Sequence, residues 1–177
     1  MFTWFLEVVP ALVGVIVLAI TYNRFRLTPL LYFLILLHSI ILMIGGHYTY
    51  AEVPFPDIFS NIFGEGRDNF DKIGHLAQGF VPAIIAREIL IRKKIINGKY
   101  WLGFIVVSIC LAFSALYELV EWAVALTTGE DAEAFLGTQG YVWDTQSDMA
   151  MALVGAMLAV ITLSKFHDTQ LKNASCK

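Results

Sequence analysis

The residues of this sequence that could do chemistry form three pairs of acidic or histidine side chains with helical spacing. The pairs are Asp71 and His75, Glu118 and Glu121, and Asp144 and Asp148. Residues three or four positions apart lie on one face of a helix, so each pair presents two polar groups in one direction. Carboxylates with an imidazole are ligands for divalent cations such as Mg, Mn or Zn. A water bound to such a cation can act as a hydrolytic nucleophile.

The segments that carry these pairs are apolar and long. Hydrophobic residues make up 58% of the 177-residue chain and charged residues 15%, a composition typical of a multi-pass membrane protein. A spanning helix needs about 20 mostly apolar residues, and the segments that qualify are about 4–22, 28–46, 71–92, 101–126 and 145–164. They predict an all-α polytopic bundle of five transmembrane helices. Because they use nearly the whole chain, residues 1–177 are expected to form a single integral membrane domain.

The connections between these segments differ in charge. Basic residues gather in the first and third connections and in the C-terminal tail, namely Arg24, Arg26, Arg92, Lys93, Lys94, Lys99, Lys165, Lys172 and Lys177. The second and fourth connections are mainly acidic. Since basic connections stay on the cytoplasmic side, the N-terminus is predicted outside and the C-terminus inside. The basic clusters suit anionic lipid headgroups and do not indicate nucleic acid as a partner.

With this orientation, all three pairs lie at the outer ends of their helices. A carboxylate at the bilayer centre costs about 2.5–3.5 kcal/mol on insertion scales, so these side chains should turn away from lipid and into the bundle. Small residues on the same stripes, including Ala152 and Gly155, should let the helices approach closely. We therefore expect one acidic site that faces the outer membrane surface.

Roles can be assigned within this hypothesis. Asp71, His75, Glu118 and Asp148 are the expected metal ligands. Glu121 would act as the general base on a metal-bound water, and Asp144 would orient the site from beside it. The expected reaction is hydrolysis or group transfer on a lipid or cell-envelope substrate. The segment "GEDAEAFLGTQGY", with glycines as flexible points, is expected to close over the site as a lid.

Two alternatives remain open. The acids could bind a cationic solute or a proton without catalysis, as a binder or carrier. They could also form a buried network with Arg67 and Lys72 that only locks the bundle. Of the other polar residues, His38 is expected to pack between helices, and Arg87 to extend to the headgroups as a structural residue. No pattern in the sequence sets the oligomeric state.

The same residues carry a resemblance to known proteins. The stretches "NFDKIGHLAQGFVPAIIAREIL", "AFSALYELVEW", "AFLGTQGYVWDTQSDM" and "ALVGA" closely resemble the bacterial inner-membrane family typified by YjdF, whose members carry a domain of unknown function. The resemblance covers nearly the whole chain and implies a multi-pass helical bundle in the bacterial inner (plasma) membrane, without an established reaction.

A more distant similarity is to the VanZ-like proteins. Their Asp-Lys-x-x-His block is matched by Asp71, Lys72 and His75, and their Glu-x-x-Gln block by Glu118. Their third block, Asp-x-x-x-Asn-x-x-Gly, is matched by Asp148 and Gly155. This chain departs from the pattern with Glu121 in place of Gln and Ala152 in place of Asn.

Overall fold

The described part of the chain is helical. The computed structural model describes residues 2–48, 50, 53–54, 70–128 and 141–175, and these contain no strand. The helices are α1 (Phe2–Thr21), α2 (Pro29–Tyr48), α4 (Phe70–Arg92), α5 (Lys99–Thr128) and α7 (Asp144–Ser175). The predicted all-α fold class is thus confirmed. The largest difference concerns the last helix, because the predicted span ends near residue 164 whereas α7 continues to Ser175.

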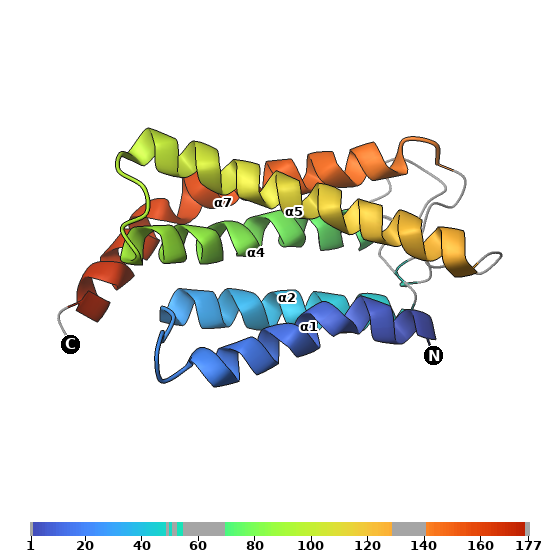
Figure 1. Cartoon of the computed structure of the whole chain (residues 1–177), viewed down its shortest axis with the longest axis horizontal. Coiled ribbons are helices and arrows are strands. Elements are labelled where there is room, and N and C mark those ends of the chain that lie inside the picture. The colour runs from blue at the N-terminus through green and yellow to red at the C-terminus, as the bar shows by residue number, and fades with distance from the viewer. Residues whose placement is uncertain (1, 49, 51–52, 55–69, 129–140, 176–177) are drawn as a thin grey trace.

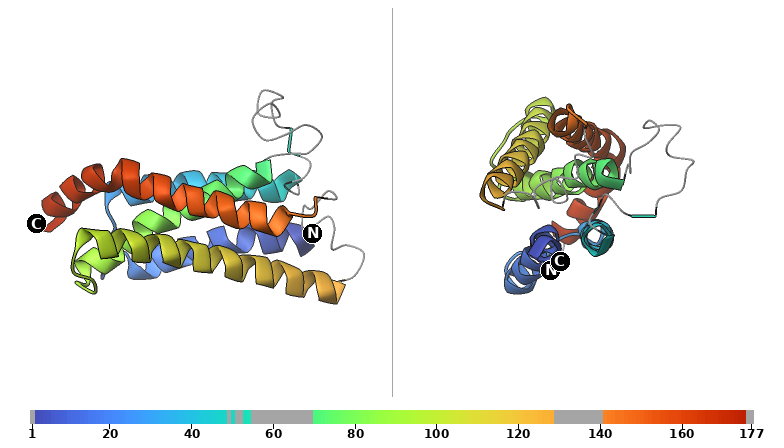
Figure 2. Two further views of the ribbon diagram at one scale, coloured as in Figure 1. Left: turned by 90° about the horizontal axis from the view of Figure 1, so that it is seen from above. Right: turned by 90° about the vertical axis from the view of Figure 1, so that its right-hand side faces the viewer.

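The helices lie side by side in two groups. α4, α5 and α7 form one group, and α1 with α2 forms the other (Figures 1 and 2). α4 is the central helix, since it contacts α7, α5 and α2, while α1 packs against α2. The chain alternates in direction from helix to helix, so the starts of α4 and α7 and the end of α5 share one end of the bundle. We call this the acidic end, and the opposite end, with the connections 22–28 and 93–98, the basic end.

The outer surfaces of the helices are apolar. Among the described residues, the helices long and apolar enough to cross a membrane are Pro29–Tyr48, Lys99–Thr127 and Asp144–Asn173, with Val8–Thr21 as a shorter apolar helix. Large side chains such as Ile20 (71% exposed) and Ile161 (76% exposed) point outward, as expected for contact with lipid tails. α4 is less apolar because it carries charges at both ends. Its neighbours enclose it, so several of these charges are buried in protein.

α4 and α7 touch through their backbones. A Cβ atom on Gly79 would lie 1.8 Å from the carbonyl oxygen of Ala152, and one on Gly155 would lie 2.1 Å from the carbonyl oxygen of Leu76. A side chain at either glycine would therefore force the helices apart. The predicted close approach at Ala152 and Gly155 is confirmed, and it fixes how the first turns of α4 and α7 face each other.

Tyr50 joins α2 to α4 near the acidic end. Its backbone N–H donates to the carbonyl of Gly45 at 2.8 Å, and its positive φ of 40° turns the chain back after α2. The phenol ring occupies the space beside Gly45 and Gly74, where a Cβ atom would come within 2.3 and 3.0 Å of ring atoms. The start of α4 is thereby held against the end of α2.

A buried polar cluster joins the helices at the basic end. The fully buried Glu88 carboxylate accepts hydrogen bonds from the Thr28 hydroxyl at 2.8 Å and from Arg92 at 2.8 Å. His167 Nε2 lies 3.0 Å from the same carboxylate. Arg87 is also buried, and it donates to His167 Nδ1 at 2.8 Å. Since a guanidinium only donates, His167 accepts at Nδ1 and carries its proton on Nε2.

The expectation that Arg87 extends to the headgroups is therefore wrong. Besides His167, Arg87 binds the Asp168 carboxylate at 2.6 Å. Gln170 accepts a hydrogen bond from the Leu30 N–H at 3.0 Å. These partners lie on the part of α7 beyond the predicted span, and they explain why the helix continues. The last turns of α7 cover buried charges of α4.

Candidate metal site at the acidic end

Three helices supply the side chains of the acidic cluster. Asp71 and His75 lie in the first two turns of α4, and Asp144 and Asp148 lie in the first two turns of α7. Glu118 lies in the second half of α5, on the same buried stripe as Cys110 and Ser114. The structure brings these residues to one end of the bundle because α4 and α7 run in the same direction and α5 runs against them.

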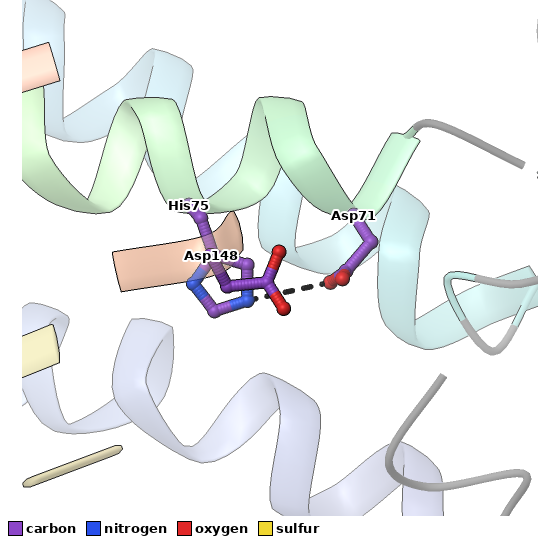
Figure 3. A group of neighbouring side chains, drawn as sticks. All are labelled: Asp71, His75 and Asp148. Atoms are coloured by element: carbon purple, nitrogen blue, oxygen red, sulfur yellow. Dashed lines mark ion pairs between the residues drawn. The ribbon is translucent and has the colours of Figure 1, made fainter. Parts of the chain in front are cut away.

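Asp71, His75 and Asp148 form the centre of the cluster. Each offers one ligand atom, and these atoms all lie within 4.8 Å of one another. Figure 3 shows the three side chains pointing toward one another, with His75 Nε2 3.5 Å from Asp71 Oδ1. Around a tetrahedral ion with bonds of about 2.1 Å, ligand atoms are about 3.4 Å apart. The histidine–aspartate separation matches this value, and the outer limit of 4.8 Å requires a small inward rotation of side chains.

Glu118 approaches the other nitrogen of the same imidazole. Its Oε1 lies 3.8 Å from His75 Nδ1, whereas Asp71 faces Nε2. Histidine ligands commonly donate their second ring N–H to a carboxylate, which fixes the tautomer and the ring orientation. Glu118 occupies the place of such a partner. It is not a member of the group of three whose ligand atoms lie within 4.8 Å.

The two remaining sequence-predicted residues lie beside the centre. Glu121 is half-buried one turn after Glu118, and it interacts electrostatically with His75, Asp71 and Asp148. Asp144 is buried at the first position of α7, one turn before Asp148. Among the described residues, neither belongs to the group of three. Their expected roles as general base and orienting residue stay predictions.

Several buried polar atoms of the cluster have no hydrogen-bond partner within the described protein. They are His75 Nδ1, Ser114 Oγ, Glu118 Oε1 and Asp148 Oδ1. The side chains are almost completely enclosed, with His75 6% and Asp148 3% exposed. A buried polar group without a partner costs about 1–3 kcal/mol, and native proteins rarely leave such groups unsatisfied.

Ser114 is the residue of this cluster to which the sequence assigned no role. It is fully buried and lies one turn before Glu118 on α5. Its four-residue spacing to Glu118 places both side chains on the same helix face, and the sequence already indicates this shared stripe.

The described residues give less information on the predicted ion-pair network, the lid and the membrane orientation. Lys72 Nζ lies 5.9 Å from the centre of the Tyr141 ring. Arg67 and most of the expected lid, residues 129–140, lie outside the described residues. The inside or outside position of either end stays a prediction.

Comparison with known proteins places this architecture in a family. The sequence profile of a family described as "Predicted membrane protein (DUF2238)" matches residues 1–169. The chain is also similar to the Escherichia coli (strain K12) protein "Inner membrane protein YjdF", with 52% identity over 170 residues. That alignment covers 96% of this chain and 81% of the relative. No solved structure matches, and the distant similarity to VanZ-like proteins stays a prediction.

Proposed function

Because the chain belongs to the DUF2238 family of membrane proteins, we propose that the acidic end of its bundle binds a divalent cation through Asp71, His75 and Asp148. The protein is a multi-pass bacterial inner-membrane protein, like its relative. The observation that carries the proposal is the buried, unpartnered Asp148 Oδ1, in a group whose other ligand atoms, from Asp71 and His75, lie within 4.8 Å.

The donor set favours a hard or borderline cation. Two carboxylates and one imidazole, without a cysteine in the cluster, suit Mg, Mn or Zn. Buried carboxylates are costly unless a positive charge or hydrogen bonds compensate them. A dication held by Asp71 and Asp148 would supply that compensation. The glycine contacts between α4 and α7 hold the two carboxylates in reach of each other.

The position of Glu118 refines its expected role. Because its Oε1 lies 3.8 Å from His75 Nδ1, Glu118 would accept the second ring N–H when the site holds a cation, and Nε2 would then serve as the ligand atom. A bound cation would supply Lewis acidity and lower the pKa of a bound water, and Glu121 would be the general base. The substrate class we propose is a lipid or other envelope compound, since the cluster lies at one end of a membrane-spanning bundle.

A carrier that moves a solute or proton through the bundle is less well supported. Between the acidic cluster and the Glu88–His167 cluster, the interior around α4 and α7 contains buried apolar residues and glycines. They include Gly79, Ala83, Ile84, Ala152, Ala156 and Ala159. This apolar layer separates the two polar clusters along α4 and α7, which favours a one-sided site.

The proposal is tested by melting detergent-solubilised protein with and without Mg, Mn or Zn. A cation that binds only the folded state stabilises it by RT ln(1 + [L]/Kd), about 2.7 kcal/mol at 100 times Kd. We expect one of the metals to raise the melting temperature of the wild type, and Asp148→Asn and His75→Ala to abolish the increase. Gln146→Ala, an exposed change on the same helix, is the control and should keep the increase.

Metal analysis of protein purified without chelator provides the second measurement. We expect a bound divalent metal in the wild type and in Gln146→Ala, and its loss in Asp148→Asn. A wild type that holds no metal and shows no metal-dependent melting would contradict the proposal. If Asp148→Asn then also lowered the stability strongly, the cluster would be a structural network.

A further inference from the structure

A cavity of about 520 Å³ lies between α1, α2 and α4, away from the acidic cluster. α1 and α4 both pack against α2, and the cavity lies between the three helices. Gly14 of α1 widens this space: a Cβ atom there would meet no other atom within 4 Å. The volume falls in the range of about 300–1,000 Å³ typical of ligand pockets.

The wall of the cavity is almost entirely apolar. It includes Val17, Leu18, Val81 and Ile85 among other aliphatic side chains. Away from Lys93, the polar side chains of the wall are the imidazole of His38 and two hydroxyl groups. Each hydroxyl donates to a carbonyl of its own helix: Thr21 to Val17 at 2.6 Å and Ser39 to Ile35 at 2.8 Å. An occupant must therefore be mainly hydrocarbon.

The charge on the wall lies at one end. The lining extends along α4 from Val81 to Lys93, which at 1.5 Å per residue is about 18 Å. One leaflet contributes about 15 Å to the hydrocarbon core of a bilayer. The cavity thus spans about one leaflet, on the side of the basic end. Lys93, at its mouth, lies 5.6 Å from the ring centre of Phe25, another lining residue.

We propose that this cavity binds one acyl chain of an anionic phospholipid from the leaflet at the basic end, with the lipid phosphate at Lys93. Arg92 is engaged by Glu88 and by the carbonyl of Arg26, whereas Lys93 itself lines the cavity. Basic pockets between transmembrane helices select anionic headgroups by charge, and the apolar channel holds the chain. The site is independent of the metal site, which lies at the other end of α4.

The test uses purified full-length protein and two defined lipids, phosphatidylglycerol and phosphatidylcholine, with retention measured by native mass spectrometry. We expect the wild type to retain phosphatidylglycerol in preference to phosphatidylcholine. Gly14→Leu fills the cavity and should abolish the retention. Lys93→Gln removes the charge and should weaken binding of phosphatidylglycerol about fivefold, toward the level of phosphatidylcholine.

Two matched variants control for unspecific effects. Val15→Leu enlarges a side chain on the exposed face of α1, and Lys165→Gln removes an exposed charge from α7. Both should retain phosphatidylglycerol like the wild type. Equal retention of the two lipids by the wild type, or unchanged preference in Lys93→Gln, would overturn the proposal. If Gly14→Leu does not fold, the charge variant still decides. Metal-dependent melting of Lys93→Gln should be unchanged, so that this result is separate from the metal site.

Discussion

The two ring nitrogens of His75 face different carboxylates, so the two sides of the imidazole have different partners. Nε2 points to Asp71, with Asp148 nearby, while Nδ1 points to Glu118. The proposed cation would therefore bind on the Nε2 side of the imidazole, where Asp71 and Asp148 lie. The same geometry separates the roles of the acids, since one group surrounds the proposed cation and another holds the imidazole.

Replacing Glu118 by glutamine distinguishes a metal site from a structural network. Near several other acids, loss of this charge removes repulsion, so the metal-free protein should be unchanged or more stable. Loss of the carboxylate partner of His75 should weaken metal affinity about 10–100-fold. Both effects can be measured by melting with and without a metal series.

A purely structural role of Glu118 predicts a different result for the same substitution. If Glu118 served only as the partner of a cation such as the half-buried Lys72, its replacement would cost up to about 3–5 kcal/mol without metal. Such a loss, combined with unchanged metal-dependent stabilisation, would contradict the assigned role. Gln146→Ala again serves as the control for the preparation.

Spacing in the sequence could predict which side chains share a face, but not which atoms face each other. The intervals between Asp71 and His75 and between Asp144 and Asp148 place each pair on one helix face. The side of the imidazole that meets Glu118 depends on rotamers set by packing of three helices. For that reason the sequence grouped Glu118 with the ligands, while the distances give it a different position.

At the scale of the helices, the contact between α4 and α7 positions the site. The sequence predicted the small residues of α7 at this contact, including Ala152 and Gly155. Gly79 on α4 was not identified, because a single glycine in an apolar segment has no distinctive pattern. The end of α7 was also missed, since hydropathy follows the part of a helix that crosses lipid. His167 and Asp168 are polar, yet they are held against α4 by a buried hydrogen bond from His167 to Glu88 and by an ion pair between Asp168 and Arg87.

Adding one methyl group at Gly155 should disturb this contact. A Cβ atom there would lie 2.1 Å from a backbone carbonyl of α4, so the helices must separate. We expect Gly155→Ala to destabilise the protein by about 1–3 kcal/mol and to weaken metal-dependent stabilisation, because Asp148 moves relative to His75. Unfolding in mixed detergent measures the first effect, and melting with metal measures the second.

Gly103→Ala is the matched control for this variant. A Cβ atom at Gly103 would lie 3.7 Å from Val160 Cγ1 of α7, an ordinary van der Waals distance. Since alanine favours the helix over glycine, this change should be neutral or stabilising, by up to about 1 kcal/mol. Equal effects of the two substitutions would show that the close approach does not limit stability.

At the scale of the whole molecule, polar groups are concentrated at the two ends and apolar groups occupy the middle. The acidic cluster and the Glu88–His167 cluster lie at opposite ends of α4. Between them the interior is apolar, and the outward surfaces carry large hydrophobic side chains. This distribution suits a bundle embedded in a bilayer. Composition and the length of the apolar segments were sufficient to predict it, because both follow directly from the thickness of the membrane.

The orientation of the bundle determines which compartment the proposed metal site serves and which leaflet supplies the proposed lipid. The connections at the basic end carry Arg24, Arg26, Lys93 and Lys94. The positive-inside rule therefore predicts that the basic end is cytoplasmic and that the acidic end faces outward.

Reporter fusions test this orientation. Fusions of alkaline phosphatase should be active at Gly64 and Gly137, and fusions of a fluorescent protein should be bright at Gly98 and Lys177. Because α4 is not among the described helices that are long and apolar enough to cross a membrane, the pair of fusions on either side of it is the most informative. If the reporters at Gly64 and Gly98 gave the same location, α4 would not span the membrane. The metal and lipid sites would then have to be reassigned to leaflets and compartments.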